Sequence, residues 1–347
     1  MQGSKAPIGQ VGENRFRGTI LAGLLVPLPT DYVQGFDSQK YDEEIGLARR
    51  VDGKLVMRGQ WYSPLQTLLF KLPLGTLALL AAMAVYLVAR IARRRRVELG
   101  ELAALIPAAY LLALLATQTG LNWAFRYTLP ALPFFFVGAG AVIRAALTSR
   151  VGRVFVALCI AWDTAVVLRA RPSFLAYGNE IVGGFDGARR EFLGSNLDWG
   201  QDLLRLKAWQ NAHPEIGPIA ITYYGVSNPG NIGLEVRGLP ATFLRAEAST
   251  FDESEDLKPE SFYWAISSSV LNGLPGPIIV GEDLTVNAAI RCQRLNWDKA
   301  AYNVGNSIFI FKVVANSSQA GREPSVTFDD LRGCIVPLDE RQRVVSP

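Results

Sequence analysis

The sequence LPLGTLALLAAMAVYLVA fills residues 72–89, and LAALIPAAYLLALLATQTGLNWAF fills residues 102–125, both without a charged side chain. About 20 helical residues cross the roughly 30 Å hydrocarbon core of a bilayer, so each stretch predicts a transmembrane helix. Two shorter apolar stretches, residues 127–143 and 154–168, predict two further spans, the second interrupted only by Asp163. These stretches place the fold in the class of polytopic α-helical membrane proteins.

The N-terminal segment predicts a half-length span. Residues 18–30 are apolar but contain Pro27 and Pro29, and the polar segment 1–17 before them lacks the pattern of a signal peptide. We therefore expect about five spans in a transmembrane region of residues 18–170, which includes an outer loop at residues 31–64.

Arginines assign the two sides of the membrane. Residues 1–170 carry 19 Lys and Arg against 10 Asp and Glu, and these cations stand beside the apolar stretches, an arrangement that argues against nucleic-acid binding. Most arginines between the spans gather in two connections, residues 90–96 and residues 144–153. Cytoplasmic loops are enriched in Lys and Arg. We therefore expect both connections and the N-terminus in the cytoplasm, and the chain from residue 171 onward on the extracytoplasmic side.

The second half of the chain predicts a small extracytoplasmic α/β domain, bounded at residues 171–315. Residues 218–224, 262–267 and 307–314 have the composition of strands bounded by Gly, Pro and polar residues. Ser195 and Asp198 have the spacing of a capping box, which predicts a helix from there to about Gln210. Further expectations are a second helix at 282–295, a solvated acidic loop at 251–260 and a loose tail at 316–347.

Few residues of this chain suit metal or nucleophilic chemistry. One histidine, His213, and three cysteines argue against a His/Cys zinc site and leave any histidine-dependent triad to a single residue. In an oxidising compartment Cys292 and Cys334 are candidates to pair, whereas Cys159 is expected in the core of the last span. Asp163, an acid within an apolar helix, is a functional candidate unless a neighbouring helix or water satisfies it.

Several segments, taken in order, resemble a known family. They are GFDSQKYDEE (35–44), GQWYSPLQTLLFKLPLGTL (59–77), NWAFRYTLPALPF (122–134), GSNLDWGQDLLRLKAW (194–209) and NVGNSIFIF (303–311). Over roughly residues 20–315 the chain resembles the C-terminal half of bacterial membrane glycosyltransferases of the GT-C class. These are the relatives of protein O-mannosyltransferases and of the lipid A aminoarabinose transferase.

This resemblance implies an integral enzyme of the bacterial inner membrane. Such an enzyme transfers a sugar from a polyprenyl-phosphate carrier to an extracytoplasmic acceptor, usually with a divalent metal ion. The family carries its catalytic carboxylate in a first outer loop within a longer N-terminal membrane region, and the segments quoted above match only the later part. Three interpretations are therefore open: a fragment, one piece of a split gene that needs an N-terminal companion chain, and a derivative that has lost activity.

Cations at the outer ends of helices suit the phosphate of such a donor, because charge there is partly desolvated. Arg126 and Lys71 occupy such positions, and Tyr127 next to Arg126 can stack on a sugar or hydrogen-bond to it. The alternative for all three is an ordinary interfacial anchor, since Lys, Arg and Tyr commonly extend from helix ends toward the headgroups.

Carboxylates are needed because a base must take the proton of the acceptor hydroxyl. The acids of the first outer loop are Asp37, Asp42, Glu43 and Glu44, of which Asp37 is the best catalytic candidate. Asp198 and Trp199 are candidates for acceptor or carbohydrate contact, although capping and packing account for much of their pattern.

A function from another class also remains open. The chain could be a catalytically inactive membrane-anchored protein whose extracytoplasmic domain binds a glycan or a protein partner. A transporter is disfavoured, because the sequence has neither paired broken helices nor repeated halves.

Overall fold

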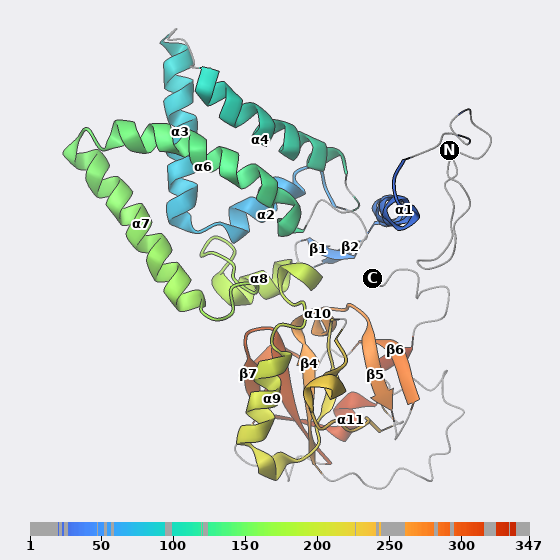
Figure 1. The fold of residues 1–347 in the computed structure, drawn as a ribbon. Coiled ribbons are helices and arrows are strands. Elements are labelled where there is room, and N and C mark those ends of the chain that lie inside the picture. The colour runs from blue at the N-terminus through green and yellow to red at the C-terminus, as the bar shows by residue number, and fades with distance from the viewer. Residues whose placement is uncertain are drawn as a thin grey trace.

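The computed structural model describes residues 20, 23, 27–46, 48–51, 54–56, 59–93, 99–118, 120, 124–225, 227–240, 243, 261–280, 284–291, 295–315, 324–332 and 334–337. In Figure 1 a group of long helices lies above a smaller sheet domain. The helices before residue 171 are α1 (Thr30–Ile45), α2 (Ser63–Lys71), α3 (Leu74–Ala92), α4 (Leu99–Thr117), α5 (Phe125–Thr128), the 3-10 helix η1 (Leu129–Ala131), α6 (Leu132–Ala146) and α7 (Arg150–Ala170).

Among the described residues, three stretches of helix are long and apolar enough to cross a membrane: α3, the continuous stretch Phe125–Ala146, and α7. Helix α4 is 19 residues long and contains Pro107; the part of it described without a gap as apolar helix, Leu105–Thr117, is too short to be counted with these three. The half-length span expected at residues 18–30 falls almost entirely outside the described residues. The expectation of about five spans is therefore not supported, and membrane association rests on three candidate spans.

Residues 31–64, expected as a loop, contain regular structure. Helix α1 fills the first part, and a hairpin of β1 (Arg49–Val51) and β2 (Lys54–Val56) follows it. The helix escaped prediction because TDYVQGFDSQKYDEEI has no apolar stripe, and an apolar stripe is the pattern that marks a surface helix.

Asp163 of α7 is satisfied by a neighbouring helix. Its carboxylate accepts hydrogen bonds from the Thr76 backbone N–H at 3.3 Å and from the Thr76 hydroxyl at 2.7 Å. A Cβ at Gly75 would lie 2.4 Å from Asp163 Oδ1 and 2.3 Å from the Cys159 carbonyl oxygen, so this contact needs a glycine. Asp163 therefore caps the N-terminus of α3, where negative charge is favourable.

The sheet domain follows α7. Its helices and 3-10 helices are α8 (Gly184–Glu191), η2 (Gly194–Asn196), α9 (Leu203–Ala212), η3 (Pro214–Ile216), η4 (Pro229–Ile232), α10 (Ser268–Leu271), η8 (Trp297–Lys299) and α11 (Phe328–Leu331). Its strands are β3 (Ala220–Thr222), β4 (Phe262–Ser267), β5 (Gly276–Val280), β6 (Leu284–Ile290), β7 (Tyr302–Val304), β8 (Ile308–Val314), β9 (Ser325–Thr327) and β10 (Ile335–Pro337). One sheet follows the path β3-β4-β8-β7 with β9 also paired to β8, and a three-stranded sheet has the order β10-β6-β5.

Strand β8 is buried on both faces, which explains its apolar sequence. Ile308 and Ile310 pack in the cluster that contains residues of α9, whereas Phe309 and Phe311 face a second cluster around Trp264. Alternate side chains of a strand point to opposite faces, so a strand covered on both sides needs a near-continuous apolar run. The strands expected at 218–224, 262–267 and 307–314 are confirmed as β3, β4 and β8.

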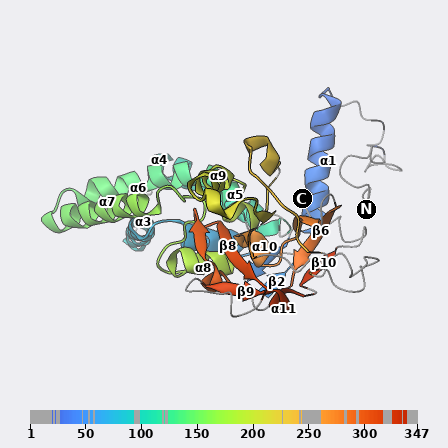
Figure 2. The same ribbon diagram turned by 90° about the horizontal axis from the view of Figure 1, so that it is seen from below.

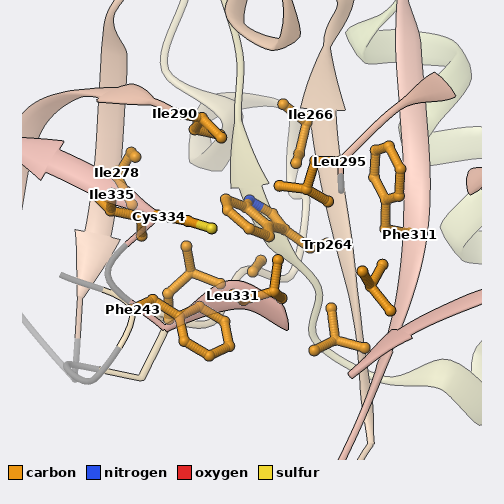
Figure 3. Packing of buried hydrophobic residues seen from close by; sticks show 14 of the residues in the cluster. Phe243, Trp264, Ile266, Ile278, Ile290, Leu295, Phe311, Leu331, Cys334 and Ile335 are labelled. Atoms are coloured by element: carbon orange, nitrogen blue, oxygen red, sulfur yellow. The ribbon is translucent and has the colours of Figure 1, made fainter. Parts of the chain in front are cut away.

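Trp264 lies in the middle of the larger cluster, as Figure 3 shows. Its side chain is fully buried, and its Nε1 donates to Thr222 Oγ1 at 3.1 Å. Cys334, which belongs to the same cluster, is disulfide-bonded, and Cys159 is free and buried. Cys292, the partner expected for Cys334, lies outside the described residues.

Two expectations for the C-terminal part were wrong. Residues 284–290 form strand β6 instead of part of a helix, because β6 pairs with β5 on one side and β10 on the other, and its Ala288 and Ile290 are buried. The expected loose tail adds β9, α11 and β10 to the domain. The acidic stretch 251–260 lies outside the described residues.

Candidate functional site

Lys71 ends α2 inside a cage of backbone oxygens. Its Nζ donates to the carbonyls of Leu175 at 2.9 Å, Tyr177 at 2.7 Å and Asn196 at 2.7 Å, and lies 4.8 Å from the centre of the Phe192 ring. An ammonium group has three N–H donors, so the cage uses all of them. Burial lowers the pKa of Lys71 to about 7, and the carbonyl oxygens oppose this by favouring the charged form. Lys71 thus ties α2 to the sheet domain, in place of the expected phosphate contact.

Asn196 joins the sheet domain to a second helix. Its side-chain Oδ1 accepts from the backbone N–H of Phe125, the first residue of α5, at 2.8 Å, while its carbonyl binds Lys71. The first N–H groups of a helix have no partner within the helix, so a side chain of the SNLDWGQDL segment caps α5. Because Arg126 follows Phe125, this contact fixes Arg126 next to the sheet domain.

Arg126, Tyr127, Trp199 and Tyr224 form a surface group, called here the Arg126–Trp199 cluster. The guanidinium carbon of Arg126 lies 4.7 Å from the centre of the Tyr127 ring and 5.7 Å from that of the Trp199 ring, and its Nη2 donates to Tyr127 Oη at 3.0 Å. The Trp199 and Tyr224 ring centres are 6.0 Å apart. Arg126 and Trp199 are exposed, Trp199 by 53%.

Asp198 adjoins this cluster as a fully buried carboxyl group. Its Oδ1 accepts from the Gly200 N–H at 2.9 Å, whereas its Oδ2 has no hydrogen-bond partner among the described residues. Burial raises the pKa of Asp198 to about 7; the Gly200 N–H and the nearby Ser267 hydroxyl oppose the rise, and the charge of Asp202 adds to it. A carboxyl with this pKa changes its protonation near neutral pH, as a group that exchanges protons with a substrate does.

Tyr223 and Tyr224 are members of this region that the sequence did not reveal. Burial raises the pKa of both phenols, and the charge of Asp198 adds to the rise; at Tyr224 the charge of Arg126 opposes it. The Tyr223 hydroxyl is buried without a hydrogen-bond partner in the described part of the chain. A Cβ at Gly225 would lie 2.5 Å from the Tyr223 ring, so the backbone approaches the ring closely. The sequence feature that could have indicated these two tyrosines is Tyr-Tyr-Gly directly after a strand, because functional side chains often stand on the loops that follow strands.

The helix predicted from Ser195 begins later, at Leu203 of α9. Gly200 has a φ of +82°, in the left-handed region, and this interrupts a right-handed helix. The carboxylate of Asp202 accepts from the Ser307 hydroxyl at 2.7 Å and pairs with Arg205. Asp198 and Asp202 therefore order the turn before α9, and the capping-box prediction was wrong.

The divalent metal ion that the resemblance implies stays a prediction. No group of three His, Cys, Asp or Glu side chains among the described residues is placed to hold one, and no step below uses a metal. Asp37 is half-buried on α1, and α1 stands apart from α9 in both views (Figures 1 and 2). Glu43 and Glu44 lie on the same helix, while the side chain of Asp42 is outside the described set.

The structure therefore brings together Arg126, Tyr127, Asp198 and Trp199, and it leaves Lys71 and Asp37 in other places. No protein-family profile, curated protein or solved structure matches this chain. Any function must consequently be inferred from the chemistry of the cluster and its position at the end of a candidate span.

Proposed function

We propose that this protein is glycosyltransferase-like and binds a polyprenyl-phosphate sugar at the Arg126–Trp199 cluster, from which the sugar passes to an acceptor. One observation carries the proposal. The exposed guanidinium of Arg126, at the start of an apolar helix, packs against the exposed indole of Trp199 in the sheet domain. Arginine matches the geometry of phosphate, and an aromatic face presents apolar surface to the C–H face of a sugar ring.

The depth of Arg126 supports a lipid-linked donor. Arg126 is the second residue of the candidate span Phe125–Ala146, so it lies where the span meets the headgroups. The phosphate of a polyprenyl carrier lies at the same level. Tyr127 and Trp199 belong to the residue types that concentrate at this interface.

One contact and the positions of two arginines support a side of the membrane for the sheet domain. Lys71, before α3, bonds to the carbonyl of Leu175, after α7, so the chain crosses the membrane an even number of times between them. We therefore propose α4 as a fourth crossing beside the three candidate spans. Arg90 is in the last turn of α3 and Arg150 is the first residue of α7, and these two helix ends are remote from the sheet domain in Figure 1. Their positive charge supports the extracytoplasmic side for that domain.

The proposed transfer is a direct displacement. The acceptor hydroxyl attacks the anomeric carbon, the bond from that carbon to the phosphate oxygen breaks, and the carrier phosphate leaves with the negative charge. Arg126 neutralises this charge. Asp198 receives the acceptor's proton on its unsatisfied Oδ2, which requires part of the cluster to move aside because this carboxyl is enclosed.

A second candidate is glycan or carrier binding without transfer. The position of Asp37 favours it, because the best acid of the first outer loop lies on α1, apart from α9 (Figure 1). In this case the Arg126–Trp199 cluster still binds the carrier, but no sugar leaves it.

The test is binding of undecaprenyl phosphate to the detergent-solubilised full chain, followed by tryptophan fluorescence. Arg126→Gln should weaken binding about 10- to 100-fold, because a hydrogen bond to a charged group is worth about 1.5–3 kcal/mol. Arg153→Gln, on the opposite end of the helices, is the matched control and should bind as the parent does. Equal affinity of Arg126→Gln and parent would reject the site. With an undecaprenyl-phosphate sugar labelled in the sugar as the second probe, binding without release of the label would favour the second candidate.

A further inference from the structure

Helix α2 has two different faces. Its buried residues are Ser63, Pro64, Thr67, Leu68 and Lys71. On the other side Trp61, Leu65 and Leu69 are exposed by 65%, 51% and 43%. Leu65 and Leu69, four residues apart, lie on one face of α2, and Trp61 stands in the turn just before it. None of the three side chains is charged. Lys71, the cation of α2, is enclosed in its carbonyl cage.

This apolar face lies at the entrance to a candidate span. Only Leu72 and Pro73 separate α2 from α3, and in Figure 1 α2 runs across the lower end of α3. A short helix that lies across the start of a transmembrane helix is at the depth of the lipid headgroups. Trp61 and Tyr62, directly before α2, are the residue types enriched at that depth.

A second exposed apolar group lies at the end of another span. Phe174 and Ile181 follow α7 and are exposed by 55% and 53%. The bonds from Lys71 Nζ to the carbonyls of Leu175 and Tyr177 hold this segment against the end of α2. The exposed apolar residues of α2 and the pair Phe174 and Ile181 are therefore held at the same depth in the membrane, where α3 begins and α7 ends.

We propose that α2 lies in the headgroup layer as an interfacial helix, with Trp61, Leu65 and Leu69 inserted toward the acyl chains. The occupant of this face is lipid because the face continues directly into α3, whose start must meet the membrane surface. Insertion of α2 sets the height of the sheet domain above the bilayer through the Lys71 cage. This inference requires α3 to cross the membrane and is independent of sugar transfer.

Spin labels test the inference in the full chain, reconstituted in vesicles of phosphatidylcholine and phosphatidylglycerol. Labels are attached at Leu65→Cys and Leu69→Cys in a Cys159→Ala background. The matched control is Leu204→Cys, an equally apolar side chain that is 68% exposed on α9 of the sheet domain. Collision with oxygen reports lipid, and collision with a water-soluble nickel complex reports water.

At Leu65→Cys and Leu69→Cys we expect oxygen collisions to exceed nickel collisions, and at Leu204→Cys the reverse. Nickel-dominated collisions at the α2 positions would overturn the inference by placing this face in water. Low collision rates with both reagents would also overturn it, because they would mean that a protein surface covers α2. All three positions are exposed, so the labels do not displace core residues.

Discussion

Asp198 and Lys71 are both ionisable residues in buried positions, but their surroundings differ. Each N–H of Lys71 meets a carbonyl oxygen, whereas Oδ2 of Asp198 has no described hydrogen-bond partner. An unsatisfied buried polar group costs about 1–3 kcal/mol. Lys71 therefore has the environment of a structural residue, and Asp198 that of a residue kept at some cost to stability.

The raised pKa of Asp198 makes stability depend on pH. In the unfolded chain this carboxyl ionises at about pH 4, but in the folded protein it keeps its proton up to about pH 7. Between these values the folded state binds more protons, so the free energy of unfolding falls as pH rises. Asp198→Asn, which cannot ionise, should flatten this fall. The measurement is the thermal midpoint in detergent from pH 4.5 to 8, and an unchanged slope in the variant would count against the assignment.

Asn196 is expected to position Arg126. Asn196→Ala removes the acceptor of the Phe125 N–H, which should cost about 1 kcal/mol of stability as the loss of a helix cap. It should also weaken binding of undecaprenyl phosphate several-fold, because α5 is no longer held against Trp199. Asn296→Ala, which removes an exposed side-chain contact to Asp298, serves as control. Full affinity in Asn196→Ala would show that Arg126 is placed by other contacts.

At the scale of elements, the sequence predicts those whose pattern is strong over their whole length. The strands β3, β4 and β8 are apolar runs bounded by turn residues, and three of the apolar stretches are candidate spans. Residues 284–290 were wrongly predicted as part of a helix, because the strands that pair with them on both sides outweigh their helix-like composition. The late start of α9 depends on the backbone of Gly200, which composition does not show.

The candidate site was predictable only in part. Arg126, Tyr127 and Trp199 stand at helix ends or in a distinctive segment, so position and resemblance together pointed to them. The contribution of Asn196 depends on a contact with Phe125, 71 residues earlier in the chain. Tyr224 joins the cluster only through its ring contact with Trp199. Such long-range pairings have no local pattern.

The junction of α3 and α7 provides a test of packing in the helical half. Gly75→Ala would put a Cβ 2.3 Å from the Cys159 carbonyl oxygen, which should destabilise the protein by about 1–3 kcal/mol. At Gly140 of α6 an added Cβ would meet no other atom within 4 Å, so Gly140→Ala should be neutral or slightly stabilising. Unfolding in detergent measures both. Equal stabilities would mean that α3 and α7 do not pack as described.

At the scale of the whole molecule, the Lys71 cage couples the helices to the sheet domain. Lys71→Met keeps the length of the side chain but leaves the carbonyls of Leu175, Tyr177 and Asn196 without this donor. We expect a loss of about 3 kcal/mol and faster proteolysis of the segment after α7. Lys54→Met, at an exposed position of β2, is the control. If Lys71→Met resists protease as the parent does, the cage is not what joins the two halves.

The central claim is that the sheet domain and the Arg126–Trp199 cluster lie on the side of the membrane opposite to the arginine-rich helix ends. Labelling with a membrane-impermeant maleimide tests it directly, using Leu204→Cys on α9 and Leu147→Cys after α6 in the Cys159→Ala background. We expect Leu204→Cys to react in intact cells with a permeabilised outer membrane, and Leu147→Cys to react only after lysis. Reaction of both from outside, or of Leu147→Cys alone, would contradict the claim.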